Sequence, residues 1–136
     1  MILIKDDHAP LWFLSLNKIK RENTMSWTDK LNGTKTQLRS LNKAIPETTK
    51  AFGELGKTVK KDASLSFKEK EYVALGIAVA TRCEPCIMFH VEALVRLGAT
   101  RDEVGEVLAT CIQMAGGPGM MYAGKALEIY DELAAR

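Results

Sequence analysis

Helix start signals constrain the fold of this chain more than any other sequence feature. Ser66-Phe67-Lys68-Glu69 and Thr100-Arg101-Asp102-Glu103 are both capping boxes, in which a hydroxyl side chain and a glutamate side chain satisfy each other's free backbone amides at a helix start. Pro46 and Pro85 suit the first turns of two further helices. These four positions divide the chain into helical segments joined by short loops.

Apolar residues recur at three- and four-residue steps from Trp27 onward, and no segment has a convincing strand pattern. We therefore expect a first helix that carries Leu31, Leu38, Leu41 and Ile45 and is interrupted or weakened near Gly33, and a second from Pro46 that carries Phe52, Leu55 and Val59 on one side. A third helix should run from Phe67 to about Ala80, and a fourth through Pro85 and His90 to Leu97, where Gly98 caps it. The last two should run from Thr100 to a turn at 116–119 and from about Met120 to Ala134.

This pattern predicts an all-α fold, a compact multi-helix bundle formed as a single domain by residues 25–136. The helix around Ala74–Val79 has little polar surface, so we expect it to be central. Apolar helices in so short a chain also favour coverage by partner subunits, and hence a homo-oligomer. Residues 1–24 differ in pattern from the rest of the chain, and Met25 would make a natural start, so we interpret them as a leader or extension.

Charge and apolar patterning exclude several classes of protein. The formal net charge of +2 is small and the lysines are dispersed, which argues against nucleic-acid binding. No segment reaches the 18 or so apolar residues needed to span a bilayer, so we expect no membrane partner. Three cysteines, two of them closely spaced, do not form a secreted disulfide framework, and we expect a cytoplasmic protein.

The most chemically informative residues are Cys83 and Cys86, spaced so that they can exchange between dithiol and disulfide. Pro85 places Cys83 just before a helix and Cys86 within its first turn, where free backbone amides and the helix dipole favour a thiolate. His90 follows Cys86 by four residues and lies on the same helical face. It can act as a base toward Cys86 or stabilise the thiolate as imidazolium.

Other interpretations of these residues remain open. Cys83, Cys86 and His90 could hold zinc with a distant fourth ligand such as Cys111, although structural zinc sites usually show two ligand pairs. Cys111 is most simply a small buried residue. By periodicity alone, Glu71 is a surface carboxylate in a first helical turn.

Two further segments favour an ordinary structural interpretation. The basic cluster from Lys57 to Lys61 is typical of a solvated helix end. Gly116-Gly117-Pro118-Gly119 lacks the residues of a phosphate loop and indicates a turn between helices.

Together, Glu71, Cys83, Cys86 and His90 resemble the motif of the carboxymuconolactone decarboxylase superfamily, in its alkyl hydroperoxidase D-like branch. That motif is a glutamate, eleven residues, Cys-x-x-Cys, three residues and a histidine, and all four positions match. The resemblance covers roughly residues 40 to 135. It implies an all-α fold that assembles as homotrimers or homohexamers, and it raises Glu71 to a candidate site residue.

The resemblance also implies a mechanism. Cys86 would attack a small hydroperoxide and become a sulfenic acid, and Cys83 would resolve it as a disulfide. His90 would accept the thiol proton, with Glu71 orienting it or relaying the proton. An external dithiol of the lipoyl or thioredoxin type would then reduce the disulfide, and the chemistry needs no metal or flavin cofactor.

One position departs from the family pattern. Peroxidase members can carry a further histidine where Pro85 stands, so this chain has one proton-handling group fewer. We expect an antioxidant peroxidase or disulfide reductase. The alternatives are a lyase of the carboxymuconolactone decarboxylase type, which would leave the cysteine pair unexplained, and a non-catalytic redox sensor.

Overall fold

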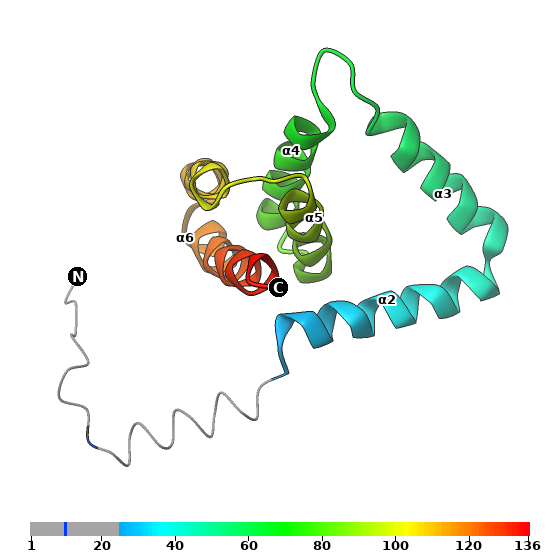
Figure 1. Cartoon of the computed structure of the whole chain (residues 1–136), viewed down its shortest axis with the longest axis horizontal. Coiled ribbons are helices and arrows are strands. Elements are labelled where there is room, and N and C mark those ends of the chain that lie inside the picture. The colour runs from blue at the N-terminus through cyan, green and yellow to red at the C-terminus, as the bar shows by residue number, and fades with distance from the viewer. Residues whose placement is uncertain (1–9, 11–24) are drawn as a thin grey trace.

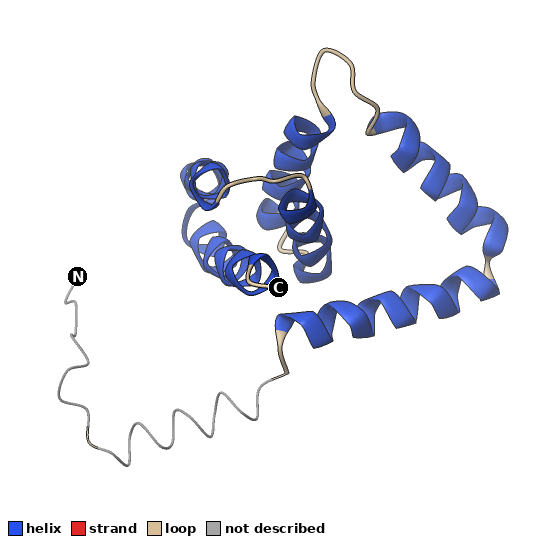
Figure 2. Ribbon diagram, viewed as in Figure 1, coloured by secondary structure: helices blue, strands red, loops and turns tan. Residues whose placement is uncertain are grey.

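The described part of the chain, Pro10 and residues 25–136 of a computed structural model, contains helices and no strand (Figures 1 and 2). The helices are α2 (Trp27–Ala44), α3 (Pro46–Val59), α4 (Phe67–Ala80), α5 (Glu84–Arg96) and α6 (Arg101–Ala134). The predicted all-α fold is therefore confirmed. The leader or extension predicted for residues 1–24 lies outside the described residues, apart from Pro10.

The predicted helix boundaries follow from local chemistry, and most are confirmed. Both capping boxes form, with Ser66 and Thr100 as the N-cap residues of α4 and α6. Pro46 and Pro85 lie in the first turns of α3 and α5, where a missing N–H costs nothing. Gly98 has a φ of 71°, the left-handed conformation that ends a helix.

The turn predicted at residues 116–119 is shorter than expected. Only Gly116 leaves the helical conformation, with φ 64° and ψ −148°, and α6 resumes directly after it. Pro118 is tolerated there because it lies in the first turn of the second half of the helix. Gly119 lets the two halves approach, since a Cβ at this position would lie 2.9 Å from the carbonyl oxygen of Cys111.

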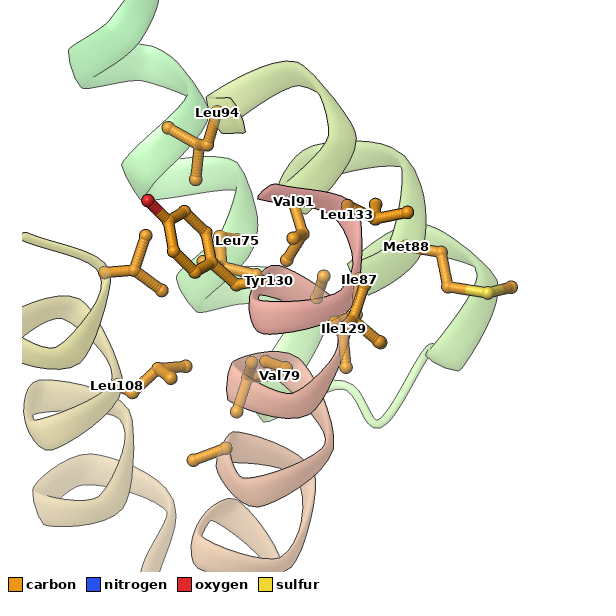
Figure 3. Packing of buried hydrophobic residues seen from close by; sticks show 14 of the residues in the cluster. Leu75, Val79, Ile87, Met88, Val91, Leu94, Leu108, Ile129, Tyr130 and Leu133 are labelled. Atoms are coloured by element: carbon orange, nitrogen blue, oxygen red, sulfur yellow. The ribbon is translucent and has the colours of Figure 1, made fainter. Parts of the chain in front are cut away.

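The core lies between α4, α5 and α6 (Figure 3). Its fully buried large side chains include Leu31, Leu75, Val79, Ile87, Val91, Leu94, Val104 and Ile129. Tyr130 packs among them and donates its hydroxyl hydrogen to the carbonyl oxygen of Ala99 at 2.7 Å, so its polar end is satisfied. The prediction that α4 is central is right for one side only, because Ile77 on α4 is 60% exposed.

α2 and α3 together form an arm, most of which extends away from this core (Figure 1). α2 is continuous through Gly33, so the interruption predicted there is wrong. Only the first turns of α2 reach the core, through Trp27 and Leu31. α3 buries no residue, and Phe52 on its apolar side is 77% exposed. The amphipathic pattern predicted for these helices is present, but none of the described residues covers its apolar side on α3.

None of the helices in the described residues combines the length and the apolar character that crossing a membrane requires.

Candidate redox site

The turn between α4 and α5 places both cysteines at the N-terminal end of α5. Arg82 has a φ of 58°, a left-handed conformation that is uncommon for a residue other than glycine. The turn is closed by a hydrogen bond from the Cys83 amide to the carbonyl oxygen of Ala78 at 3.0 Å. Cys83 is then the N-cap residue and Cys86 lies in the first turn, as the sequence predicted.

Cys83 and Cys86 form a disulfide, with their Cα atoms 5.2 Å apart. Both residues are partly buried, and Cys86 packs against the core cluster. Opening this disulfide would leave the Cys86 sulfur beside the free backbone amides of the first turn of α5, which stabilise negative charge. The arrangement can therefore support a reactive thiolate.

Glu84 lies between the two cysteines, and its negative charge would oppose a thiolate. Its carboxylate accepts a hydrogen bond from Lys125 of α6 at 2.7 Å and lies 3.9 Å from the Lys30 ammonium of α2. Two cations from different helices therefore offset the one unfavourable charge within the motif.

Glu71 and His90 meet across the interface of α4 and α5. A Glu71 carboxylate oxygen lies 2.7 Å from Nδ1 of His90. Glu71 is only 4% exposed, so the surface position that periodicity predicted for it is wrong. A carboxylate can only accept, so Nδ1 carries the hydrogen and Nε2 of a neutral His90 is left free to accept a proton.

The second oxygen of Glu71 accepts a hydrogen bond from the Lys60 ammonium at 2.5 Å. Burial alone would raise the pKa of the Glu71 carboxyl, but the hydrogen bonds from His90 and Lys60 outweigh it and hold that pKa below its ordinary value. Glu71 is thus an ionised carboxylate with a cation on one oxygen and an imidazole on the other.

The sequence did not reveal the part played by Lys60. The solvated helix end predicted for Lys57 to Lys61 describes Lys57, which is exposed and pairs with Glu54 of its own helix. It is wrong for Lys60, which is partly buried against Glu71. Glu71 follows Lys60 by eleven positions, across the loop between α3 and α4, and no local pattern indicates such a contact.

Cys111 is buried on α6, as predicted, and burial raises the pKa of its thiol. It lines an open apolar pocket of about 330 Å³ between α4 and α6, with Tyr72, Val73 and Met114 among its neighbours. Within residues 25–136, no three His, Cys, Asp or Glu side chains are arranged to hold a metal ion. The four-ligand zinc set considered from the sequence is therefore not assembled there.

Comparison with known proteins shows the family to which the chain is similar. The model of the carboxymuconolactone decarboxylase family matches residues 46–128. An uncharacterized protein of Cupriavidus necator is 42% identical over 99 residues, which are 73% of this chain and 88% of the relative.

Two crystal structures share the fold. One is a carboxymuconolactone decarboxylase family protein from Legionella pneumophila, with a TM-score of 0.77 and 40% identity, covering 79% of this chain and 96% of that one. The other is a family protein from Thermotoga maritima, described as a candidate participant in the antioxidative response, with a TM-score of 0.70, 25% identity and coverage of 78% and 91%. On sequence and on fold alike, the chain belongs to the carboxymuconolactone decarboxylase family.

Proposed function

We propose that this protein is a thiol-dependent peroxidase or disulfide reductase of antioxidant defence, cycling between the Cys83–Cys86 dithiol and its disulfide. The observation that carries the proposal is the contact of 2.7 Å between the buried Glu71 of α4 and the partly buried His90 of α5, which follows Cys86 by four residues on the same helix. A structural disulfide would not require an ionised carboxylate and an imidazole beside it. Support also comes from the Thermotoga maritima relative and its description as a candidate in the antioxidative response.

The oxidative half of the cycle begins at Cys86. Its thiolate attacks the terminal oxygen of a small hydroperoxide, the O–O bond breaks, and an alcohol leaves as Cys86 becomes a sulfenic acid. The Cys83 thiolate then attacks the Cys86 sulfur, and the hydroxyl group leaves as water. One hydroperoxide, two thiols and no other oxidant give one alcohol, one water and one disulfide.

Proton handling falls to His90 and Glu71. Nε2 of His90 accepts the proton of the Cys86 thiol, which raises the thiolate fraction, and it can return that proton to the leaving oxygen. Glu71 holds Nδ1–H and so fixes the tautomer that leaves Nε2 free. Because Pro85 stands where peroxidase members can carry a further histidine, we expect peroxide reduction to be slower than in those members.

An external dithiol of the lipoyl or thioredoxin type closes the cycle. One of its thiolates attacks the sulfur of Cys83, which forms a mixed disulfide and frees Cys86 as the leaving thiolate. Cys86 is the better leaving group because the first turn of α5 stabilises its charge. The second donor thiol then resolves the mixed disulfide and restores the dithiol. The cycle takes place in the cytoplasm, where thiols are kept reduced.

A second copy of this chain covers the apolar side of the arm in the assembled protein, as a homotrimer or homohexamer. The arm presents Phe52, Leu55 and Val59 on one side of α3, each more than half exposed within the chain. A row of exposed apolar side chains of this size is typical of an interface.

The test is a single-turnover oxidation. Reduced protein receives about one equivalent of cumene hydroperoxide, and the cysteines are mapped by mass spectrometry at intervals. We expect a Cys83–Cys86 disulfide within seconds. Oxidation no faster than that of a free thiol would refute peroxidase activity, and rapid reduction of the disulfide by dihydrolipoamide would then leave disulfide reduction as the function.

Single substitutions distinguish the roles of the two cysteines in the reaction. Cys86→Ser should abolish peroxide consumption, whereas Cys83→Ser should permit one oxidation event and trap a sulfenic acid that dimedone captures. Cys111→Ser is the matched control, since this buried thiol lies outside the disulfide and should not affect the rate. A full rate in Cys86→Ser would reverse the assignment of the attacking cysteine.

A further inference from the structure

Lys60 contacts Glu71 directly although the family motif does not contain it, and its position is built by several contacts. It is the C-cap residue of α3, where its amide donates to the carbonyl oxygen of Gly56 at 3.0 Å. Its ammonium lies 2.5 Å from Glu71 and 5.7 Å from the centre of the Phe67 ring. The side chain is thus held between a buried carboxylate and an aromatic face.

The loop that follows Lys60 is fastened to the start of α4. The carbonyl oxygen of Lys61 accepts a hydrogen bond from the Lys70 ammonium, and the Asp62 carboxylate accepts one from the Phe67 amide, both at 2.5 Å. These contacts determine where α3 ends relative to α4. Lys60 therefore reaches Glu71 from a backbone position that is itself fixed.

The neighbouring charges leave Lys60 as the cation that balances Glu71. α5 contributes His90 itself and Glu92, and the Glu92 carboxylate is held by Lys35 of α2 at 2.6 Å. α6 directs Lys125 to Glu84 rather than to Glu71. From α3, Lys57 pairs with Glu54 on the exposed side of the helix, so it does not substitute for Lys60.

A buried carboxylate with no cation beside it would favour the imidazolium form of His90, because the two opposite charges attract in a site of low dielectric constant. An imidazolium cannot accept the proton of Cys86. A cation on the far oxygen of the carboxylate offsets that attraction while leaving the Nδ1–H hydrogen bond in place.

We propose that Lys60 is a positioning residue of the redox site, which holds and balances the Glu71 carboxylate so that Glu71 accepts the Nδ1–H of His90 and Nε2 can accept the proton of Cys86. The structural part of this inference concerns Lys60, Glu71 and His90 alone. Its consequence for peroxide reduction rests on the proposed function.

The protonation of His90 can be followed directly. The chain has two histidines, so a His8→Gln background leaves His90 as the single imidazole in an NMR pH titration. The disulfide form of the whole chain is used, because Cys86 then cannot titrate. We expect Lys60→Met to move the titration midpoint upward by about 0.5 to 1 pH unit, as the loss of one nearby positive charge requires.

Three further variants serve as comparisons. Lys60→Gln should shift the midpoint in the same way and replaces Lys60→Met if that variant fails to fold, as judged by circular dichroism. Lys60→Arg keeps the charge and should restore the original midpoint. Lys57→Met removes a lysine from the same end of α3 and should have no effect, since Lys57 contacts Glu54 and not Glu71.

The reduced protein tests the consequence for the reaction. In Lys60→Met, the acid limb of the pH profile for Cys86 oxidation should move upward by the same interval, with the high-pH rate unchanged. An unchanged midpoint in both Lys60→Met and Lys60→Gln would overturn the proposal, whatever the protein does with peroxide. A shifted midpoint in a protein that no hydroperoxide oxidises would support Lys60 and reject the peroxidase function instead.

Discussion

The core helices and the arm have similar amphipathic sequences but opposite surroundings. Leu94 of α5 has no exposed surface, whereas Leu55 of α3 is 58% exposed, although each occupies an apolar position of a regular helix. α4, α5 and α6 cover one another's apolar sides, and no part of the described chain covers the apolar side of α3. Periodicity therefore shows which side of a helix is apolar, but not which surface covers it.

The arm is fastened to the core near its two ends. Near the start of α2, the Glu132 carboxylate accepts hydrogen bonds from the backbone amides of Trp27 and Thr28, at 3.1 and 2.8 Å. Just after α3, Lys60 contacts Glu71. One attachment uses the free amides of a helix start, and the other is part of the candidate redox site.

The largest expected effect comes from making the same substitution in both regions. Leu94→Ala should lower the free energy of unfolding by about 2 to 5 kcal/mol, since it leaves a cavity in a packed core. Leu55→Ala should change it by no more than about 0.5 kcal/mol in dilute protein. Urea unfolding followed by circular dichroism measures both.

Repeating the unfolding measurements at several protein concentrations tests whether a second copy covers the arm. A cost of Leu55→Ala that grows with concentration would indicate that a second copy covers the arm. Equal costs for the two variants at every concentration would mean that the apolar side of the arm is covered without a second copy, which would contradict the proposed assembly.

The next effect concerns assembly. Phe52→Glu should weaken self-association by about tenfold or more, because a carboxylate would have to be buried in an apolar contact. Sedimentation velocity over a range of concentrations measures it. Lys50→Gln is the control, since it changes the net charge by the same amount on the opposite side of α3. If both variants dissociate equally, charge and not apolar contact controls assembly.

A smaller effect is expected at the start of the arm. Glu132→Ala removes the acceptor for the first amides of α2 and should cost about 1 kcal/mol of stability, as the loss of a helix cap does. Glu128→Ala, an exposed glutamate one turn earlier on α6, should change stability by less than about 0.5 kcal/mol. Thermal unfolding compares the two, and equal losses would show that Glu132 does not anchor the arm.

The smallest effect is a dependence of stability on pH that arises at the start of α6, where Glu103 lies. The Thr100 amide, together with the Lys68 and Tyr72 side chains, lowers the pKa of Glu103 to about 2 from 4.5. A carboxyl whose pKa is lower in the folded state stabilises the fold above its unfolded pKa, and this stabilisation is lost as the pH falls from about 5 toward 2.

Glu103→Gln should therefore make the loss of stability between pH 5 and pH 2 less steep, as measured by urea unfolding at several pH values. Glu54→Gln removes an exposed carboxylate from the arm, where it pairs only with Lys57, and should leave the slope nearly unchanged. The same slope in Glu103→Gln and in the unaltered protein would rule out this contribution.

Local sequence predicted the helices well because their ends depend on neighbouring residues. The capping boxes at Ser66 and Thr100, and the proline in the first turn of α5, act within one turn of the chain and formed as predicted. Gly33 was misjudged, since a single glycine costs an exposed helix only about 1 kcal/mol, which is too little to end it.

The residues of the candidate site also fall into those that the local sequence indicated and those that only the packing of helices revealed. The spacing of Cys83, Cys86 and His90 on one helix end is local, and the sequence alone indicated it. The burial of Glu71 came from packing against α5, and its periodicity predicted the reverse. The resemblance to a family motif corrected that prediction, but no motif contained Lys60.

The sequence by itself determined the helical segments, their caps and the placement of a closely spaced cysteine pair at a helix start, because each depends on residues within a turn or two of one another. Only the tertiary structure decided that Glu71 is buried between His90 and Lys60, and that α3 buries no residue against the rest of the described chain. The physical reason is that burial and ion pairing depend on distances between helices, which the spacing of residues along one helix does not specify.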